Sequence, residues 1–356
     1  MQSYQLKEFG GQIAEEIFAD PVPTATEVIV RVHACGLCHS DVHFHNGHIN
    51  LGGDAKLPLE AAGAKLPLTL GHEIFGYIQA FGPLAKLTAK DIGRPVIVYP
   101  WIGCGECAPC KAGLDNACIE TPQNLGLQRP GGYGDKVVVR DEKYLVDATG
   151  IDPTIGGIYA CSGLTSYSAL QKVPANRGWV GIIGMGGVGL MGLSIAKGTG
   201  FEKVVAIDID DDRLALAHDE YRADLVVNST KAQATSNLLA ATGGLTAIID
   251  FVGSDQTSNL AFEVLAPGGT YVNVGLFGGE MRIPLAVLSL RQFTIRGSYV
   301  GSLGELKDLV DHVRGGNIRP IPVTTAPFNE TNVNDGLAAL RAGKIKGRRV
   351  LFHEEA

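Results

Sequence analysis

The stretch 180–198, "VGIIGMGGVGLMGLSIAKG", decides the fold expected for this chain of 356 residues. A short apolar strand at 180–184 turns through "GMGGVG" into a helix, and a second apolar stretch, "KVVAID", follows and ends in Asp208. Asp208 lies nineteen residues after Gly189. Strand, glycine-rich turn, helix, second strand and terminal acid in this order are typical of a dinucleotide-binding unit.

Each glycine of this turn has a physical reason. Gly184 permits the tight turn, Gly186 lets the backbone approach a pyrophosphate, and Gly189 lets the helix pack closely on the strand. The N-terminus of the helix supplies the positive end of a dipole for the phosphates. Asp208 can accept hydrogen bonds from a ribose 2′-hydroxyl.

The charges after the second strand indicate which dinucleotide binds. Three further acids, Asp210, Asp211 and Asp212, would repel a 2′-phosphate. Arg213 is the only nearby cation in the sequence. The sequence therefore predicts NAD in preference to NADP.

Strands and helices go on alternating after this unit. Strands are expected at "ADLVVN", "TAIIDFVG", "GTYVNVG" and "FTIRGSYV", and helices near "KAQATSNLLAAT" and "SNLAFEVL". This alternation predicts a doubly wound parallel sheet over about 163–300. Residues 1–162 would form a first domain, and 301–356, with a helical pattern at "LGELKDLVDHV", would return to it.

Composition excludes several classes of protein. A formal charge of −7 and a pI near 5.7 argue against a nucleic-acid partner, which would need a basic face. The N-terminal sequence shows no secretion signal. Residues 178–196 carry no charge, but their glycines favour a strand, turn and helix over a membrane span. A cytoplasmic enzyme without membrane contact is expected.

Four cysteines lie together in "CGECAPCKAGLDNAC", at Cys104, Cys107, Cys110 and Cys118. Their thiolates can converge on one tetrahedral zinc ion, and four protein ligands would leave no open position, which indicates a structural role. Disulfides at such short spacings would be strained. An iron–sulfur run would place its fourth cysteine closer and follow it with proline.

A second metal-rich stretch is "HACGLCHSDVHFHNGH", residues 33–48, with five of the nine histidines of the chain. "CGLC" could be a redox pair, but such a motif should open a helix after a strand and would not explain the histidines. Cys35 alone is expected to be a small buried residue at the end of the strand "EVIVRVHA".

Together these motifs resemble the zinc-dependent medium-chain alcohol dehydrogenases over nearly the whole chain. The resemblance rests on "CGLCHSD", "GHE" at 71–73, the four-cysteine loop, "ACSGLTSYSAL", "GMGGVG" and "GRRVL". It implies an α/β fold with a doubly wound (Rossmann) cofactor domain and a β-rich GroES-like catalytic domain.

The resemblance also implies a second, catalytic zinc ion, held by Cys38, His72 and Cys161 with water or substrate in the fourth position. Asp41 resembles the carboxylate that orients the ligating histidine, and Glu73 a family residue beside the zinc. The expected reaction is hydride transfer between an alcohol and NAD, giving an aldehyde or ketone.

A proton relay and the cofactor contacts follow from the same resemblance. Ser40 would hydrogen-bond the alcohol and pass its proton toward His43 through the ribose hydroxyls. The expected cofactor contacts are His39, Thr165, Gly184, Gly186, Gly187, Val188, Gly189, Asp208, Arg213, Val252, Val274 and Arg348. His33, His45 and His48 have no role and are expected to be exposed or at a pocket rim.

Some questions stay open in the sequence. A polyol or amino-alcohol dehydrogenase would share zinc and NAD, and a catalytically silent zinc-stabilised nucleotide binder would share the fold. The segment "AKLPL" occurs twice, at 55–59 and 64–68, so the extra copy either caps the substrate pocket or is a tolerated surface insertion. A small-molecule substrate in the cleft and a homo-oligomer, a tetramer rather than a dimer, are expected.

Overall fold

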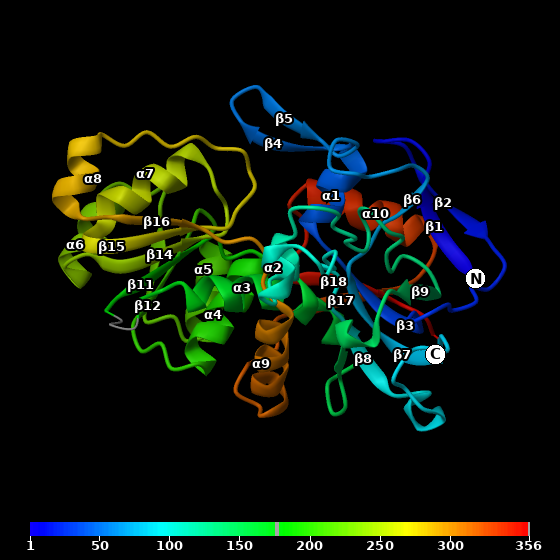
Figure 1. The fold of residues 1–356 in the computed structure, drawn as a ribbon. Coiled ribbons are helices and arrows are strands. Elements are labelled where there is room, and N and C mark those ends of the chain that lie inside the picture. The colour runs from blue at the N-terminus through cyan, green and yellow to red at the C-terminus, as the bar shows by residue number, and fades with distance from the viewer. Residues whose placement is uncertain (175–177, 355–356) are drawn as a thin grey trace.

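The computed structural model describes residues 1–174 and 178–354 and shows two lobes side by side (Figure 1). One lobe is built on a six-stranded parallel sheet and the other on a seven-stranded sheet that is mostly antiparallel. The α/β class, with a Rossmann lobe and a β-rich lobe, is confirmed.

The Rossmann lobe has the strand order β13-β12-β11-β14-β15-β16. Its order turns back at β11, where the glycine-rich turn lies, as expected for a doubly wound sheet. Its elements along the chain are α3 Ser162–Gln171, β11 Val180–Ile183, α4 Gly187–Gly198, β12 Val204–Asp208, α5 Asp211–Asp219, β13 Leu225–Asn228, α6 Ala234–Thr242, β14 Leu245–Asp250, α7 Asp255–Val264, β15 Leu265–Asn273, α8 Leu285–Arg291 and β16 Thr294–Gly297.

The β-rich lobe has the strand order β10-β8-β7-β3-β18-β17, with β9 also paired to β3. A small sheet, β2-β1-β6, and a hairpin, β4-β5, lie beside it. Its strands are β1 Gln2–Leu6, β2 Ile13–Ile17, β3 Val28–Leu37, β4 His48–Gly52, β5 Ala55–Pro58, β6 Leu68–Thr69, β7 Glu73–Phe81, β8 Pro95–Val98, β9 Lys136–Val139, β10 Leu145–Asp147, β17 Val323–Pro327 and β18 Arg348–Phe352.

Helices of this lobe are short, except for the last two of the chain. They are α1 His39–Asn46, α2 Ala108–Lys111, α9 Leu303–Arg314 and α10 Glu330–Arg341, with the 3-10 turns η1 Ala89–Asp91, η2 Asp115–Ala117, η3 Glu142–Tyr144 and η4 Gly156–Ala160. Because β18 pairs antiparallel with β3, the C-terminal segment returns to the first lobe.

The core of the molecule is continuous across the two lobes. Buried apolar side chains of β3, β7 and β8 form one cluster with those of α3, α4 and α9. A second, smaller cluster fills the other face of the parallel sheet. No helix within 1–174 or 178–354 is long and apolar enough to cross a membrane.

The expected strands and helices occur, and the structure adds elements that the sequence did not predict. Helices α2, α3, α5, α8 and α10 were not among the expected helices. The histidine-rich stretch forms α1 directly after β3, so "CGLC" does join a strand to a helix, contrary to the expectation. All seven cysteines are free thiols.

Candidate active site

Helix α1 positions the first residue of the candidate active site, Cys38, at its N-cap. Its N-terminal turn is fixed by local hydrogen bonds. The side chain of Asp41 accepts a hydrogen bond from the backbone N–H of Cys38 at 2.9 Å, which caps the helix. At the other end, Gly47 adopts a left-handed conformation with φ 78° and closes the helix. Cys38 thereby lies at a rigid junction between β3 and α1.

Three donor atoms from distant segments converge at this junction. The ligand atoms of Cys38, His72 and Cys161 lie within 4.8 Å of one another, and all three side chains are buried. The two sulfur atoms of Cys38 and Cys161 are 3.8 Å apart. Two thiolates at about 2.3 Å from one tetrahedral zinc ion would be separated by about 3.8 Å.

The remaining nitrogen of His72 is the clearest sign of a missing partner. Its Nδ1 lies 3.0 Å from Asp41 Oδ1, whereas Nε2 is buried and has no hydrogen-bond partner among the described residues. A buried polar atom without a partner is costly, so a ligand is expected there. The donor set therefore fits a zinc ion with three protein ligands.

Asp41 organises the surroundings of the three ligands. Its Oδ1 accepts from Gly71 N at 3.2 Å and from His72 Nδ1 at 3.0 Å. Its Oδ2 accepts from Cys38 N at 2.9 Å and from the Tyr133 hydroxyl at 3.0 Å. The carboxylate thus fixes the tautomer of His72 and directs Nε2 toward the two thiols.

Replacement of Asp41 by Asn is expected to weaken zinc at this centre by about 10–100-fold. An amide offers one acceptor oxygen for donors that the carboxylate satisfies with two, so His72 would lose its orientation. Competition with a chelator measures the affinity. Asp91→Asn is the matched control, because that carboxylate caps η1 far from the centre. Equal zinc affinity in D41N and wild type would contradict this role.

Glu73 and Arg348 form a buried ion pair beside the three ligands. The carboxylate of Glu73 also accepts from Ser162 N at 3.4 Å, and its Oε2 has no partner among the described residues. A Cβ at Gly187 would lie 2.6 Å from Arg348 Cδ, so Arg348 packs against the glycine-rich turn. The pair therefore joins the three-ligand centre to the start of α4.

The electrostatics of the centre favour a thiolate. The hydrogen bond from Cys161, together with Arg348 and His72, holds the pKa of Cys38 well below its usual range. Burial disfavours the charged form of His72, but the Asp41 carboxylate outweighs this and raises its pKa. Thiolates are the form that binds metal ions.

The four cysteines of the loop 104–118 also converge, with all ligand atoms within 4.8 Å. Backbone N–H groups of Cys107 and Glu106 point at the sulfur of Cys104, at 3.3 and 3.4 Å, and lower its pKa to about 6. The N–H of Cys104 in turn donates to the sulfur of Cys118 at 3.3 Å. Four thiols held this way fit a tetrahedral ion with no open position.

The glycine-rich turn has the geometry of a phosphate-binding loop. Gly184 has φ +89°, a conformation that favours glycine. A Cβ at Gly189 would lie 1.7 Å from the carbonyl oxygen of Gly184, so only glycine lets α4 pack so closely. A Cβ at Gly186 would meet nothing within 4 Å, which leaves that side open for a ligand. The backbone N–H groups at the start of α4 can bind an anion there.

Asp208 ends β12 and is buried beside this turn. Its oxygens accept from the backbone N–H groups of Met185, at 2.5 Å, and of Ile209 and Asp210, at 2.7 and 3.0 Å. Arg213 lies over Asp210, with 3.8 Å between Nε and the carboxylate.

The expectation that Arg213 is the only nearby cation was wrong. Lys231 pairs with Asp211 at 2.9 Å, and Lys346 pairs with Asp212 at 3.4 Å. Lys346 comes from the C-terminal segment, which the sequence could not place here. Both lysines are exposed and already paired with these acids, whereas Asp208 is buried beside the glycine-rich turn.

The structure places the other expected contacts around the same region. Val252 packs against Gly184, and the carbonyl of Val188 accepts from the Ser166 hydroxyl at 2.9 Å. Thr165 lies one turn after Cys161 on α3, and its N–H donates to the Cys161 carbonyl at 2.8 Å. The side chains of the expected proton relay and cofactor contacts that are half-buried or exposed are those of His39, Ser40, His43, Thr165, Val188, Arg213, Val252 and Val274.

Two of the three histidines without a role lie elsewhere than expected. His45 is buried: its Nε2 donates to the Gly11 carbonyl at 2.7 Å, and its Nδ1 accepts from Arg341 at 3.2 Å. His33 packs edge-on against Phe75 and is half-buried. Both positions are set by partners distant in sequence, so an exposed site was the wrong expectation for them.

Aromatic side chains near the centre were not assigned a role from the sequence. The ring of Trp101 lies 5.3 Å from that of His72, and Phe44 lies 6.1 Å from it on another side. Tyr299 packs edge-on against Trp101 at 5.8 Å. No motif marks these residues, because they reach the centre only through tertiary packing.

Comparisons with known proteins agree with this arrangement. A zinc-binding dehydrogenase model matches residues 187–314, and an alcohol dehydrogenase GroES-like domain model matches residues 24–149. An NAD-dependent alcohol dehydrogenase of Sulfurisphaera tokodaii is 31% identical, over 99% of each chain. One from Saccharolobus solfataricus is 30% identical, over 99% of this chain and all of the relative.

Solved structures show the same fold. The alcohol dehydrogenase of Aeropyrum pernix superimposes with a TM-score of 0.86 at 29% identity, covering 99% of this chain and 100% of that one. An acetophenone reductase from Geotrichum candidum, solved with NAD, gives a TM-score of 0.83 at 27% identity, over 99% and 96% of the chains. The chain belongs to the zinc-dependent medium-chain alcohol dehydrogenase family.

Proposed function

We propose that the chain oxidises an alcohol to an aldehyde or ketone with NAD, at a zinc ion held by Cys38, His72 and Cys161. The observation that carries this proposal is the buried Nε2 of His72, which lacks a partner and lies beside two thiols. When bound, zinc acts as a Lewis acid that lowers the pKa of an alcohol hydroxyl.

The side chains of this chain supply binding and proton transfer. Ser40 and His43, both on α1, would serve as the hydroxyl and the base of a proton relay, with Ser40 on the side of the alcohol and His43 as the final acceptor. Burial lowers the pKa of His43, which favours the neutral imidazole, the form that can accept a proton. When NAD is bound, His39 and Arg348 would be the cationic or polar groups for its pyrophosphate, and Asp208 would be the acceptor for its ribose hydroxyls.

The substrate is an apolar or aromatic alcohol rather than a polyol. Phe44, Trp101 and Tyr299 surround the centre with aromatic surface. A polyol or amino alcohol would leave its additional polar groups without partners against these rings, which is unfavourable. A silent nucleotide binder would have no use for the buried Asp41 network that orients His72.

Metal content and turnover of the wild-type protein test the function. Two zinc ions per chain, with NADH formed from NAD and an apolar alcohol such as benzyl alcohol, are expected. One zinc ion per chain and no turnover would indicate the silent binder. Faster turnover of a polyol such as sorbitol would favour the polyol dehydrogenase instead.

The domains run from 1 to 162, from 163 to 300 and from 301 to 356, with the last segment part of the catalytic domain. The antiparallel pairing of β18 with β3 supports this division. We also propose a cytoplasmic location, where cysteines stay reduced and can serve as the metal ligands proposed here.

We propose that the hairpin β4-β5 caps the substrate pocket. It contains the first "AKLPL" copy and extends from the β-rich lobe toward the Rossmann lobe (Figure 1). A Cβ at Gly278 would lie 2.8 Å from Asn50 Cβ, and one at Gly52 would lie 3.1 Å from Glu280 Cγ. The hairpin thus touches the loop 278–280 of the other lobe, which supports a pocket cap over a tolerated insertion.

Replacement of Gly278 by Ala is expected to change the ratio of kcat/KM between a short and a bulky aromatic alcohol by at least about fivefold. The added methyl group would push the hairpin away at Asn50. Gly268→Ala is the matched control, because Gly268 also has a positive φ, +77°, but nothing within 4 Å. Deletion of 55–63 is less clean, since it removes the buried Leu59. An unchanged ratio in G278A would discard the cap.

The exposed edge of the parallel sheet supports a homo-oligomer. Strand β16 pairs only with β15, so its other edge offers unpaired backbone groups. Around it, large apolar side chains are exposed, including Leu290 at 82% and Leu285 at 79%. We expect a second copy to cover this surface, and a tetramer rather than a dimer in solution.

Replacement of Ile295 by Lys, on β16, is expected to split the oligomer and reduce the sedimenting mass by at least half. A lysine charge buried in the centre of an apolar interface would have no counter-charge there to offset its loss of hydration. Leu84→Lys controls for a charge at an exposed leucine on the other lobe. A wild-type chain that sediments as a monomer, or an I295K variant of unchanged mass, would contradict this interface.

A further inference from the structure

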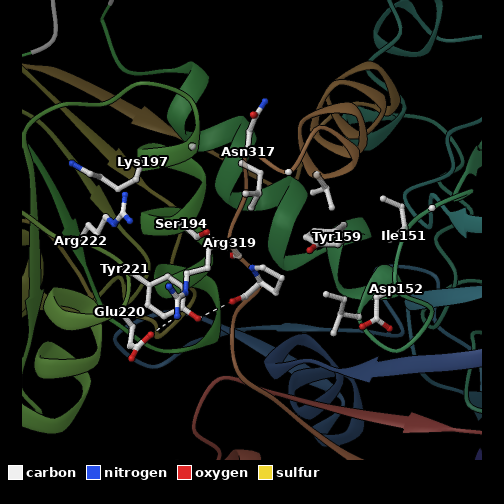
Figure 2. A pocket seen from close by; sticks show the side chains of 17 residues that line it. Ile151, Asp152, Tyr159, Ser194, Lys197, Glu220, Tyr221, Arg222, Asn317 and Arg319 are labelled. Atoms are coloured by element: carbon white, nitrogen blue, oxygen red, sulfur yellow. Dashed lines mark hydrogen bonds and ion pairs between the residues drawn. The ribbon is translucent and has the colours of Figure 1, made fainter.

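A cavity of ≈ 610 Å³ lies away from the three-ligand centre, between the two lobes. The Rossmann lobe contributes Ser194 and Lys197 of α4, the β-rich lobe contributes Ile151 and Tyr159, and the crossing segment 316–320 lies between them (Figure 2). The volume falls within the range of small-molecule sites, about 300–1,000 Å³. Nothing proposed above uses this cavity.

Tyr159 gives the cavity an unsatisfied polar group. Its side chain is fully buried, and its hydroxyl has no hydrogen-bond partner among the described residues. Figure 2 shows this hydroxyl directed to the middle of the lining. Ile151, Ile155 and Ile318 add apolar surface to the lining. A buried hydroxyl without a partner calls for a ligand atom that can accept a hydrogen bond.

The Rossmann side of the cavity carries cations. Arg222 has no ion pair or hydrogen bond from its guanidinium to any other described residue, while Lys197 pairs with Asp224 at 3.0 Å and Arg319 pairs with Glu220. Arg222 also has a φ of +58°, which is uncommon for a residue with a side chain. Backbone outliers of this kind concentrate at ligand sites.

We propose that this cavity binds a small organic anion, a carboxylate or a phosphate monoester with an apolar body that carries a hydrogen-bond acceptor. Arg222 binds the anionic group, with Lys197 beside it. The apolar body lies against Ile151 and Ile318, and the acceptor takes the hydrogen bond of the Tyr159 hydroxyl. Asp152, on the side of the lining opposite Arg222, disfavours a second negative group at the far end of the ligand, whereas Glu220 is already paired with Arg319 (Figure 2).

The position of the cavity couples it to the cofactor site. Helix α4 runs from the glycine-rich turn at its N-terminus to Lys197 in the cavity wall. The crossing segment is fixed to the Rossmann lobe by two hydrogen bonds, from the Ser194 hydroxyl to the Arg319 carbonyl at 2.6 Å and from the Tyr221 hydroxyl to the Pro320 carbonyl at 2.8 Å. A ligand that contacts both lobes and this segment therefore changes the affinity for NAD.

Calorimetry on the zinc-loaded wild-type protein tests the binding step and needs no turnover. The probes are 4-(4-methoxyphenyl)butanoate, 4-methoxyphenyl phosphate and the neutral 4-(4-methoxyphenyl)butanamide. At least one anionic probe is expected to bind once per chain, at least tenfold more tightly than the amide. The tighter of the two anions identifies the head group. Failure of both anions to bind, or equal binding of the amide, would overturn the proposal.

Variants distinguish this cavity from the zinc centre, where an anion could also bind. Tyr159→Phe removes only a hydroxyl that has no partner, and Arg222→Asn keeps a residue that tolerates positive φ. Each is expected to weaken the anionic probe at least fivefold, and Val313→Trp, which fills the cavity, to abolish binding. Lys344→Ala removes an exposed cation elsewhere and serves as control. Unchanged binding in all three cavity variants would refute the site.

The coupling has its own measurement, which rests on the proposed use of NAD. A saturating anionic probe is expected to change the dissociation constant of NAD at least fivefold in wild type and by less than twofold in Y159F. Probe binding without this change would overturn the coupling but not the site. Loss of NAD binding in the absence of probe would instead count against the proposed function.

Discussion

Replacing Cys161 by Ala is expected to remove one zinc ion per chain and to lower kcat/KM for alcohol oxidation by at least about 10⁴-fold. Two buried donors, Cys38 and His72, would remain, which is too few for a stable zinc site. Loss of the Lewis acid removes several kcal/mol of stabilisation from the transition state, and each 1.4 kcal/mol is about tenfold in rate.

The fold and the cofactor site should survive this substitution. Cys161 precedes α3, whereas the glycine-rich turn is held by its own close packing of Gly189 on Gly184. The dissociation constant of NAD, measured by fluorescence, is therefore expected to stay within about threefold of wild type. Cys35→Ala is the matched control: Cys35 is equally buried but lies outside the three-ligand cluster, so zinc content and turnover should persist.

Two results would contradict this assignment. If C161A kept both zinc ions and its activity, the three donors would not be the catalytic ligands. If C35A lost zinc and activity to the same extent, general damage to the buried region around β3 would explain both variants.

What the sequence could predict depends on how local each feature is. The glycine-rich unit was predictable because strand, turn, helix and acid are contiguous and each glycine answers a backbone requirement. The same holds for the four cysteines of the loop 104–118, which are close enough to converge without knowledge of the fold. The doubly wound sheet followed from the alternation of strands with helices.

Features that depend on distant segments were not predictable from local pattern. Spacing alone could not join Cys161 to Cys38, so the three-ligand centre came only from a family resemblance. His45 is buried because Gly11 and Arg341, from opposite ends of the chain, meet at its ring. Lys346 likewise reaches Asp212 only after the chain has crossed back.

Several helices were not predicted from the sequence, and α8 and α5 show two different physical reasons. Helix α8, Leu285–Arg291, buries no residue. Its sequence "LAVLSLR" is apolar at most positions and lacks the alternation of an apolar and a polar face that predicts a helix. Helix α5 begins within a run of acids: Asp211 and Asp212 form its first turn, and its N-cap Asp210 accepts from the N–H groups of Asp212 and Arg213. The same acids that would repel a 2′-phosphate also stabilise a helix when they lie in its first turn.

Replacing Cys110 by Ala, in the four-cysteine loop, is expected to remove the other zinc ion and to lower the Tm by at least about 10 °C. A structural zinc site contributes on the order of 10 kcal/mol of binding free energy, and the loop has little regular structure to compensate. Thermal unfolding followed by circular dichroism, with zinc quantified per chain, measures the change. Lys111→Ala, next in sequence and exposed, should leave both quantities unchanged.

The loop 104–118 also supports the wall of the active site. Loss of its zinc ion in C110A should therefore affect catalysis indirectly. The Asn116 side chain donates to the Tyr299 carbonyl at 3.1 Å, and Tyr299 packs on Trp101 beside His72. Below the lowered Tm, C110A should therefore show a raised KM for the alcohol, while kcat stays within about fivefold because the catalytic ligands are intact. Loss of zinc with an unchanged Tm would show that the loop folds without its ion, and the metal would then have no structural role.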